Sequence, residues 1–101
     1  MDWTRIPSLA ALRAFEAAAR CQSFSGASRE LNVTHAAIAH HVRSLEAEFS
    51  ESLMVRQGRG VAVTLAGRQL AESLQSGFST IAAGVETLRA QSESRPLNIT
   101  M

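Results

Sequence analysis

The segment from residue 23 to residue 46, SFSGASRELNVTHAAIAHHVRSLE, constrains the fold more than any other part of the chain. It predicts two short helices joined by a tight polar turn, which is the arrangement of a helix-turn-helix. Thr34 is suited to cap the second helix, so helical counting begins at His35. At about 100° per residue, one arc of this helix is apolar and holds Ile38, Val42, Leu45 and Phe49.

A second stripe of the same helix is suited to reading DNA. It carries small and hydrogen-bonding side chains and no acidic residue: His35, Ala36, Ala39, His40 and Arg43. Such side chains allow close approach to base edges in the major groove. We expect the first four to face the bases, with the alanines against thymine methyl groups, and Arg43 to reach a phosphate. The alternative for the histidines is a merely solvated helix face.

Three hydroxyl residues stand where these helices are expected to begin. Ser23 or Ser25 starts the first helix of the pair, and Thr34 starts the second. Hydroxyls and backbone N–H groups at helix N-termini bind phosphates well. We therefore expect all three residues to contact DNA phosphates, with plain helix capping as the alternative for each.

Charge is distributed unevenly along the chain. The formal net charge of +1 gives no argument for a nucleic-acid partner by itself. However, residues 31–45 and 52–71 contain no Asp or Glu, and they hold four arginines and all three histidines. A polyanion would meet a single sign of charge there.

The segments on either side extend this motif into a winged helix. An earlier helix begins at Ser8, and its buried side is expected at helical spacing: Leu9, Leu12, Phe15 and Ala19. After the helix-turn-helix, residues 53–56 and 61–63 predict two strands around a turn at 57–60. This hairpin would form the wing.

A long helix follows, with Thr64 as its cap, from Leu65 to about Ala90, which is roughly 39 Å. Its apolar residues form a heptad-like stripe of about two repeats: Leu70, Leu74, Phe78, Ile81, Val85 and Leu88. Gly77 and Gly84 each cost about 1 kcal/mol relative to Ala, so this helix would fray in isolation. We expect the same helix of a second subunit to cover the stripe. The alternative is that the helix folds back onto its own domain.

Other functional classes have little support in this sequence. No nucleophile elbow, phosphate loop or metal cluster accompanies its Ser, His and acidic residues, so we expect no enzyme activity, cofactor or metal site. The single Cys21 cannot form an internal disulfide and is expected to be buried. No apolar run approaches the roughly 20 residues needed to span a bilayer, and no signal peptide precedes the first helix. We therefore expect a cytoplasmic protein that does not enter a membrane.

The composition changes after the long helix. Residues 91–96 are rich in Gln, Ser and Glu and end in a proline, which indicates a hinge. Residues 97–101, LNITM, alternate apolar and polar side chains like the first residues of a strand. The chain is expected to be the front piece of a longer protein.

Three blocks of this sequence resemble the amino-terminal domain of LysR-type transcriptional regulators. They are LRAFEAAAR at 12–20, the helix-turn-helix segment at 23–46, and GRGVAVTLAGRQL at 58–70. The resemblance covers about residues 7–101 and includes the order of helix, helix-turn-helix, wing and linker helix. The first block and VTHAAIAHHV look most like the branch of glycine-cleavage activators and β-lactamase gene regulators.

The resemblance implies further contacts and partners. Arg59 at the wing tip would enter the minor groove, with a solvated turn as the alternative, and Arg56 would contact the DNA backbone. Linker helices would pair antiparallel in a homodimer, and full-length dimers would assemble into tetramers on promoter sites of dyad symmetry. A small-molecule effector would bind only to a two-lobed domain beginning near Leu97.

Three positions depart from the family pattern. The family usually has Gln where this chain has His35, and often Ser where it has Ala39. A neutral imidazole offers one donor and one acceptor, whereas glutamine can pair bidentately with adenine, so a different base preference is expected. The family also favours Gly at the end of the recognition helix, where Ser50 stands.

Together these inferences predict a mainly α fold, a winged helix-turn-helix followed by a long dimerisation helix. The expected division is a DNA-binding domain (1–64), a linker helix (65–91), and a hinge with the start of an absent effector-binding domain (92–101). The expected function is sequence-specific binding of double-stranded promoter DNA by a bacterial transcription factor. The alternative is a winged-helix protein-interaction module that does not bind DNA.

Overall fold

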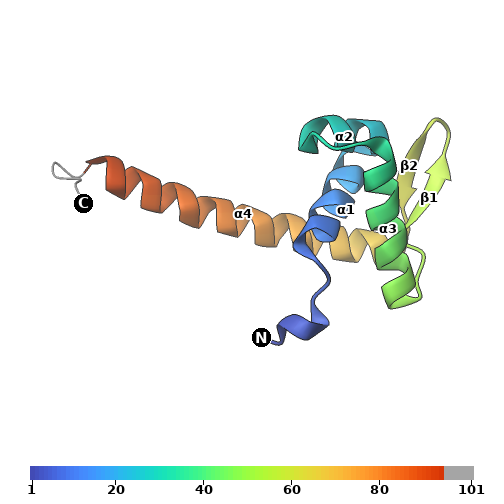
Figure 1. The fold of residues 1–101 in the computed structure, drawn as a ribbon, viewed down its shortest axis with the longest axis horizontal. Helices are drawn as coiled ribbons and strands as arrows, with labels where there is room; N and C mark the ends of the chain where they lie inside the picture. Colours follow the sequence, from blue (N-terminus) through green and yellow to red (C-terminus); the bar gives the residue numbers. More distant parts are fainter. Residues whose placement is uncertain (95–101) are drawn as a thin grey trace.

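The structure, a computed structural model, describes residues 1–94. Its elements follow in this order: a 3-10 turn (Trp3–Arg5), α1 (Leu9–Cys21), α2 (Phe24–Leu31), α3 (His35–Phe49), β1 (Met54–Gln57), β2 (Gly60–Val63) and α4 (Leu65–Ser94). The first three helices and the antiparallel β1–β2 hairpin form a head, and α4 leaves this head as a long rod (Figure 1). The predicted winged helix-turn-helix with a long final helix is confirmed. The 3-10 turn was not expected, β1 lies one residue later than predicted, and β2 begins one residue earlier than predicted.

Hydroxyl caps set the start of all four α-helices. Ser8, Ser23, Thr34 and Thr64 each accept a hydrogen bond from the backbone N–H three residues further on, at 2.9–3.1 Å. Such a bond satisfies one of the N–H groups that a helix start leaves without a partner. The predicted caps are therefore confirmed. Of the two candidates for α2, Ser23 is the cap and Ser25 lies in the first turn.

The first three helices end in left-handed residues. Gln22, Asn32 and Ser50 have φ angles of 54°, 57° and 52°. This conformation favours glycine, and asparagine tolerates it better than most other residues. Ser50, which stands where the family favours glycine, therefore ends α3 with the same left-handed backbone. Glycine would adopt this backbone with less strain.

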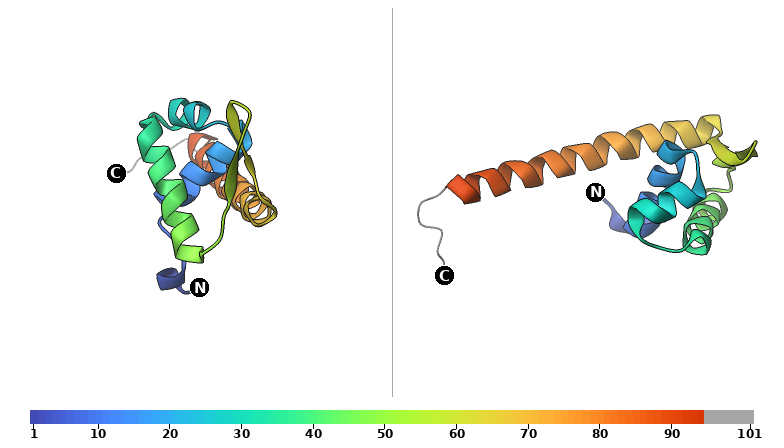
Figure 2. Two further views of the ribbon diagram at one scale, coloured as in Figure 1. Left: turned by 90° about the vertical axis from the view of Figure 1, so that its right-hand side faces the viewer. Right: turned by 90° about the horizontal axis from the view of Figure 1, so that it is seen from above.

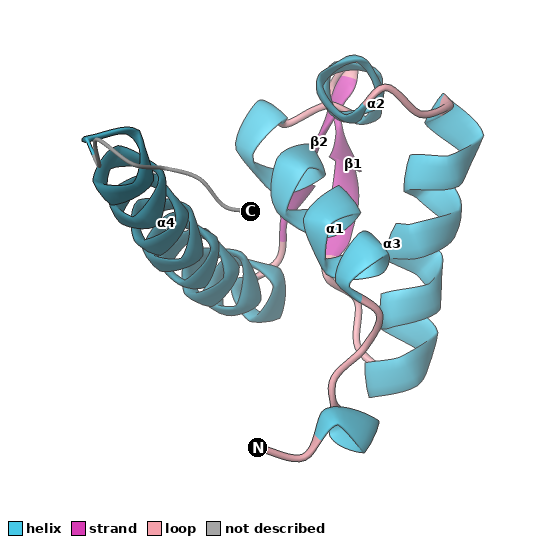
Figure 3. Cartoon of the chain, turned by 60° about the vertical axis from the view of Figure 1, so that its left-hand side comes forward, coloured by secondary structure: helices cyan, strands magenta, loops and turns pink. Residues whose placement is uncertain are grey.

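Helix α1 is the centre of the head. Helices α2, α3 and α4 all pack against it (Figure 3). The largest fully buried side chains are Phe15 of α1 with Ile38 and Leu45 of α3. Two residues expected in the core are instead exposed, Leu9 by 54% and Phe49 by 43%. Each lies at an end of its helix, Leu9 at the start of α1 and Phe49 at the end of α3.

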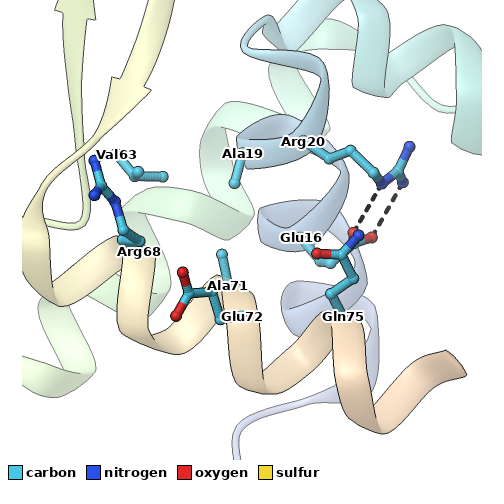
Figure 4. Close-up of a pocket in the computed structure, with 8 residues that line it drawn as sticks. All are labelled: Glu16, Ala19, Arg20, Val63, Arg68, Ala71, Glu72 and Gln75. Carbon is cyan, nitrogen blue, oxygen red and sulfur yellow. Dashed lines mark hydrogen bonds and ion pairs between the residues drawn. The ribbon is translucent and has the colours of Figure 1, made fainter. Parts of the chain in front are cut away.

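A charged contact joins α1 to α2 on the surface. The Arg20 guanidinium binds the carboxylates of Glu30 and Glu16, with N···O distances of 2.8 Å to each. Figure 4 shows its contact with Glu16. These contacts raise the pKa of Arg20, and the guanidinium lowers the pKa of Glu30. Exposed pairs of this kind contribute at most about 1 kcal/mol. Figure 4 also shows the shallow groove between α1 and α4 beside this contact.

The apolar stripe of α4 has two different environments. Its first half, Leu70, Leu74 and Phe78, packs partly buried against the core of the head. Its second half is exposed, with Ile81 at 62%, Val85 at 44% and Leu88 at 63%. Folding back onto the same domain, the alternative considered from sequence, therefore holds for the first half only.

Helix α4 is longer than predicted. It continues to Ser94, where the sequence indicated an end near residue 91. Residues 92–94, assigned to the hinge, are helical, and the remaining hinge and the expected strand from Leu97 lie outside the described residues. Among residues 1–94, no helix combines the length and apolar character that crossing a membrane requires.

The start of α4 lies directly against the backbone of Leu53. Thr64 N donates to the Leu53 carbonyl at 3.0 Å, and Thr64 Oγ1 donates to the Ser52 carbonyl at 2.7 Å. A Cβ atom added at Gly67 would lie 2.0 Å from the Leu53 oxygen. Only glycine allows this approach without displacement of the backbone.

Replacing Gly67 with alanine is therefore expected to destabilise the domain by about 1–3 kcal/mol or more, because the new methyl group overlaps a backbone oxygen. Helix propensity alone predicts the opposite sign, a gain of about 1 kcal/mol. Urea denaturation followed by circular dichroism measures the difference. The control is Gly26→Ala in α2, where the added Cβ would approach only side chains, at 3.1 Å or more. A stabilised Gly67→Ala variant would contradict the packing at Leu53.

Candidate nucleic-acid interface

Helix α3 and the hairpin lie side by side at the end of the molecule away from the free end of α4 (Figure 2). On α3, the side chains of His35, Ala36, His40 and Arg43 are exposed, as expected for the outer stripe. Ala39 departs from this expectation, since it is only 9% exposed. The reason is tertiary, because Ala39 faces a hollow whose other walls are Phe24 of α2 and residues of the hairpin.

Five of the predicted site residues meet around one small hollow. We call it the α2–hairpin hollow; its volume is about 90 Å³ and it is lined by Ser23, Phe24, Ser25, His35, Arg56, Arg59, Gly60 and Val61. None of these described lining residues is acidic. The hollow lies beside the first residues of α2 and α3, whose N-termini carry partial positive charge. Its lining thus combines two guanidinium groups, two serine hydroxyls and an imidazole, which is a suitable donor set for a phosphate.

The ring of His35 is held at the edge of this hollow by an aromatic contact. Its centroid lies 5.5 Å from that of Phe24, with the planes at 70°. Edge-to-face contacts of this kind restrict ring orientation. His40 has a different neighbour, since its ring lies 5.9 Å from the ring of His41.

A second hollow of about 160 Å³ separates α3 from the hairpin, and we call it the α3–hairpin hollow. Arg43 of α3 and Arg56 of β1 both line it, together with Ala39, which lies one turn before Arg43 on α3. Glu46 also lines it, but its Oε2 atom accepts hydrogen bonds from the backbone N–H groups of Leu53 at 2.9 Å and Met54 at 3.2 Å. The carboxylate is therefore used in joining α3 to the start of β1.

The end of the hairpin next to its turn is fixed against the residues between α1 and α2. Val61 N donates to the Gln22 carbonyl at 3.2 Å. A Cβ atom added at Gly60 would lie 2.5 Å from the same oxygen, so the close approach depends on glycine. The exposed Arg59 follows Gly58, whose φ of 60° makes the tight turn at the tip.

Sequence reasoning missed Glu46 and Gln22 as positioning residues. Glu46 is followed by a helix end and a strand start, and no local pattern reveals that its carboxylate reaches N–H groups seven and eight residues further on. The left-handed Gln22 was not identified either, because its carbonyl is used by a segment almost forty residues away. Thr34 and Ser23 act as caps, yet each hydroxyl accepts through its oxygen and retains its own O–H donor.

The arrangement of this site is that of a known family. The family model described as "Bacterial regulatory helix-turn-helix protein, lysR family" matches residues 9–68. The chain belongs to the LysR family. Its head is therefore a LysR-type helix-turn-helix DNA-binding domain.

Curated LysR-type relatives match along most of the chain. The AhcY transcriptional activator HvrB of Rhodobacter capsulatus is 45% identical over 101 residues, all of this chain and 35% of the relative. The transcriptional activator AmpR of Citrobacter freundii is 43% identical over 91 residues, 90% of this chain and 31% of the relative. The glycine cleavage system transcriptional activator of Escherichia coli K12 is 36% identical over 97 residues, 96% of this chain and 32% of the relative. The chain thus spans about a third of the length of these relatives.

Solved structures with the same fold include complexes with DNA. The BenM_DBD complex with catB site 1 DNA has a TM-score of 0.76 at 24% identity, covering 88% of this chain and 99% of that one. The CbnR_DBD–DNA complex has a TM-score of 0.68 at 26% identity, covering 88% of this chain and 100% of that one. The BenM_DBD complex shows the common fold, and the CbnR_DBD complex supports the family assignment as well.

Truncating Glu46 to alanine is expected to lower the free energy of unfolding by about 1–3 kcal/mol, because the backbone N–H groups of Leu53 and Met54 lose their acceptor. Chemical denaturation measures this loss. The matched control is Glu48→Ala, which removes an exposed carboxylate two residues along the same helix. Equal stability of the two variants would contradict the role assigned to Glu46.

Proposed function

We propose that this domain binds double-stranded promoter DNA in a sequence-specific manner, as part of a cytoplasmic LysR-type transcription regulator and not as an enzyme. The observation that carries the proposal is the α2–hairpin hollow, which gathers five predicted DNA-contact residues and no acid on the face beside α3. A helix of this exposure and length fits the major groove, with the hairpin beside it at the adjacent minor groove.

In this proposal α3 reads the bases. His35, Ala36 and His40 project from its exposed side, and each imidazole can donate or accept one hydrogen bond. Ala39 has a smaller role than its position in the stripe indicated. Its methyl group borders the α3–hairpin hollow, and a thymine methyl would reach it only through the mouth of that hollow.

The remaining site residues hold the DNA backbone. We assign phosphate contacts to Ser23, Ser25 and Thr34 at the helix starts, and to Arg43 and Arg56 along the α3–hairpin hollow. Phosphate contacts supply affinity and register and do not depend on base sequence.

The hairpin tip has a separate role. Arg59 is exposed between two glycines, so its guanidinium can extend beyond the hairpin into a narrow minor groove.

Dimerisation completes the proposal. The exposed second half of the α4 stripe, Ile81, Val85 and Leu88, is suited to pair with α4 of a second copy. Two heads related by a two-fold axis would bind a site of dyad symmetry. In a longer protein, an additional domain would bind a small-molecule effector and support assembly into tetramers.

The proposal is tested by selecting bound sites from random duplexes and measuring affinity for the selected sequence over a range of salt concentrations. We expect a dyad-symmetric consensus and a steep decrease of affinity with salt. Weak binding without salt dependence or sequence preference would instead favour a winged-helix protein-interaction module.

The Arg59→Ala variant is expected to bind the selected site more weakly, and to lower the slope of log K against log salt by about one, because one cationic contact is lost. Fluorescence anisotropy at several salt concentrations measures this slope. The control is Arg13→Ala, an exposed arginine of α1 that lines neither hollow. An unchanged slope in Arg59→Ala would count against its contact with DNA.

The His40→Ala variant is expected to lose about 1–3 kcal/mol of discrimination between the selected site and a scrambled duplex, because one base contact disappears. Its affinity for scrambled DNA should change less. Competition binding with the two duplexes measures the ratio. Equal losses on both duplexes would reassign His40 to a phosphate contact.

A further inference from the structure

One aromatic residue of α2, Phe24, lines both hollows of the candidate nucleic-acid interface. It borders the α2–hairpin hollow together with His35, and the α3–hairpin hollow together with Ala39. These two residues of α3 are four positions apart, so they lie one above the other on the same face of the helix. Phe24 also packs against the buried core of the head. Its side chain therefore extends from the core to the face of α3 that the sequence predicts to read DNA.

The imidazole of His35 has no turn of its own helix to lie against. In an α-helix, a side chain points back over the turn that precedes it. His35 is the first residue of α3, so no such turn exists for it. Within residues 1–94, the aromatic ring that contacts the exposed His35 is that of Phe24, at 5.5 Å between centroids and 70° between planes. The orientation of the imidazole therefore depends on a residue of α2.

The backbone on both sides of Phe24 is itself fixed. The left-handed Gln22 precedes it, and the Gln22 carbonyl accepts a hydrogen bond from Val61 N at 3.2 Å. The hydroxyl of Ser23 accepts from Gly26 N at 2.9 Å, and so caps the helix that begins at Phe24. A side chain can orient another one only if it is held in place. Core packing and these two hydrogen bonds hold Phe24.

We propose that Phe24 is a positioning residue for base recognition, which holds the His35 imidazole in the orientation in which a ring nitrogen meets one base pair of each half-site. This inference rests on the proposed function, because it requires that His35 contacts a base. An imidazole that is ordered before binding loses less conformational entropy when it forms its hydrogen bond. The gain is confined to the base pair that His35 contacts, so it increases sequence discrimination and not general affinity for DNA.

His40 does not depend on α2 in this way. Its neighbouring ring is His41 of the same helix, at 5.9 Å between centroids. Neither of these two rings lines the α2–hairpin hollow or the α3–hairpin hollow. Removing the ring of Phe24 should therefore change recognition by His35 and leave recognition by His40 as it is. The two histidines give a comparison within a single DNA site.

The first step of the test locates the base pair that His35 reads. The selected site is varied one base pair at a time, and fluorescence anisotropy compares the unchanged 101-residue chain with His35→Ala. We expect His35→Ala to lose about threefold to tenfold discrimination at one base pair of each half-site, the range for a single hydrogen bond. If discrimination is lost at no base pair, His35 does not read a base and the inference is overturned.

The second step replaces Phe24 with leucine, which keeps an apolar side chain and removes the ring. Phe24→Leu should lose discrimination at the same base pair as His35→Ala, and keep it at the base pair where His40→Ala has its effect. Combined with His35→Ala, it should add no further loss at that base pair, because the residue through which it acts is gone. Additive losses, or an equal loss at all base pairs, would overturn the inference.

A matched control separates positioning from packing. Leu31→Val also removes a small apolar volume from α2, and Leu31 also packs against the core but lines neither hollow. It should lower the melting temperature without changing discrimination at the base pair read by His35. If Phe24→Leu behaves like Leu31→Val, the positioning role is rejected while the proposed function stands. If the unchanged chain shows no sequence preference at all, the proposed function itself is rejected.

A measurement without substitution applies even if Phe24→Leu does not fold. Nuclear Overhauser effects between the ring protons of Phe24 and His35 should be present in the free chain and should persist on the selected duplex. Their persistence would show that the bound imidazole keeps the orientation it has in the free protein. Their loss on binding would show that DNA alone orients the ring, and would overturn the inference.

Discussion

The backbone of Leu53 is the junction on which the rest of the structure depends. Its N–H donates to the Glu46 carboxylate at the end of α3, and its carbonyl accepts from Thr64 at the start of α4. Its side chain is 3% exposed within the core, and Gly67 lies against its carbonyl oxygen. One residue thus joins α3, the hairpin and α4. The angle between α3 and the hairpin, and the direction in which α4 leaves the head, both follow from this junction.

This junction also explains how one small chain separates two surfaces. The donor-rich face of α3 and the hairpin lies at one end, and the exposed half of α4 extends from the other (Figure 1). The Glu46 carboxylate beside α3 accepts hydrogen bonds from the Leu53 and Met54 N–H groups, so it joins α3 to the hairpin. The LysR-type DNA-binding domain is therefore compatible with a dimer that places two such faces on one duplex.

Most of the secondary structure was predictable because its signals are local. Ser8, Ser23, Thr34 and Thr64 each cap within three residues, and the bounds of α3 agree with the apolar period of residues 38–45. The assembly of Ser23, His35 and Arg59 around one hollow was only partly predictable. The motif indicated that all three face DNA, but their proximity depends on a hydrogen bond from Val61 to Gln22.

The sequence by itself determined the helix starts, the turn, the hairpin and the uneven distribution of charge, because each depends on residues a few positions apart. Tertiary structure alone decided that Ala39 is covered, that Phe49 is exposed, and that only the first half of the α4 stripe is covered. Helical period shows which side of a helix is apolar. It does not show how far along that side another element reaches, since that depends on contacts between segments distant in the chain.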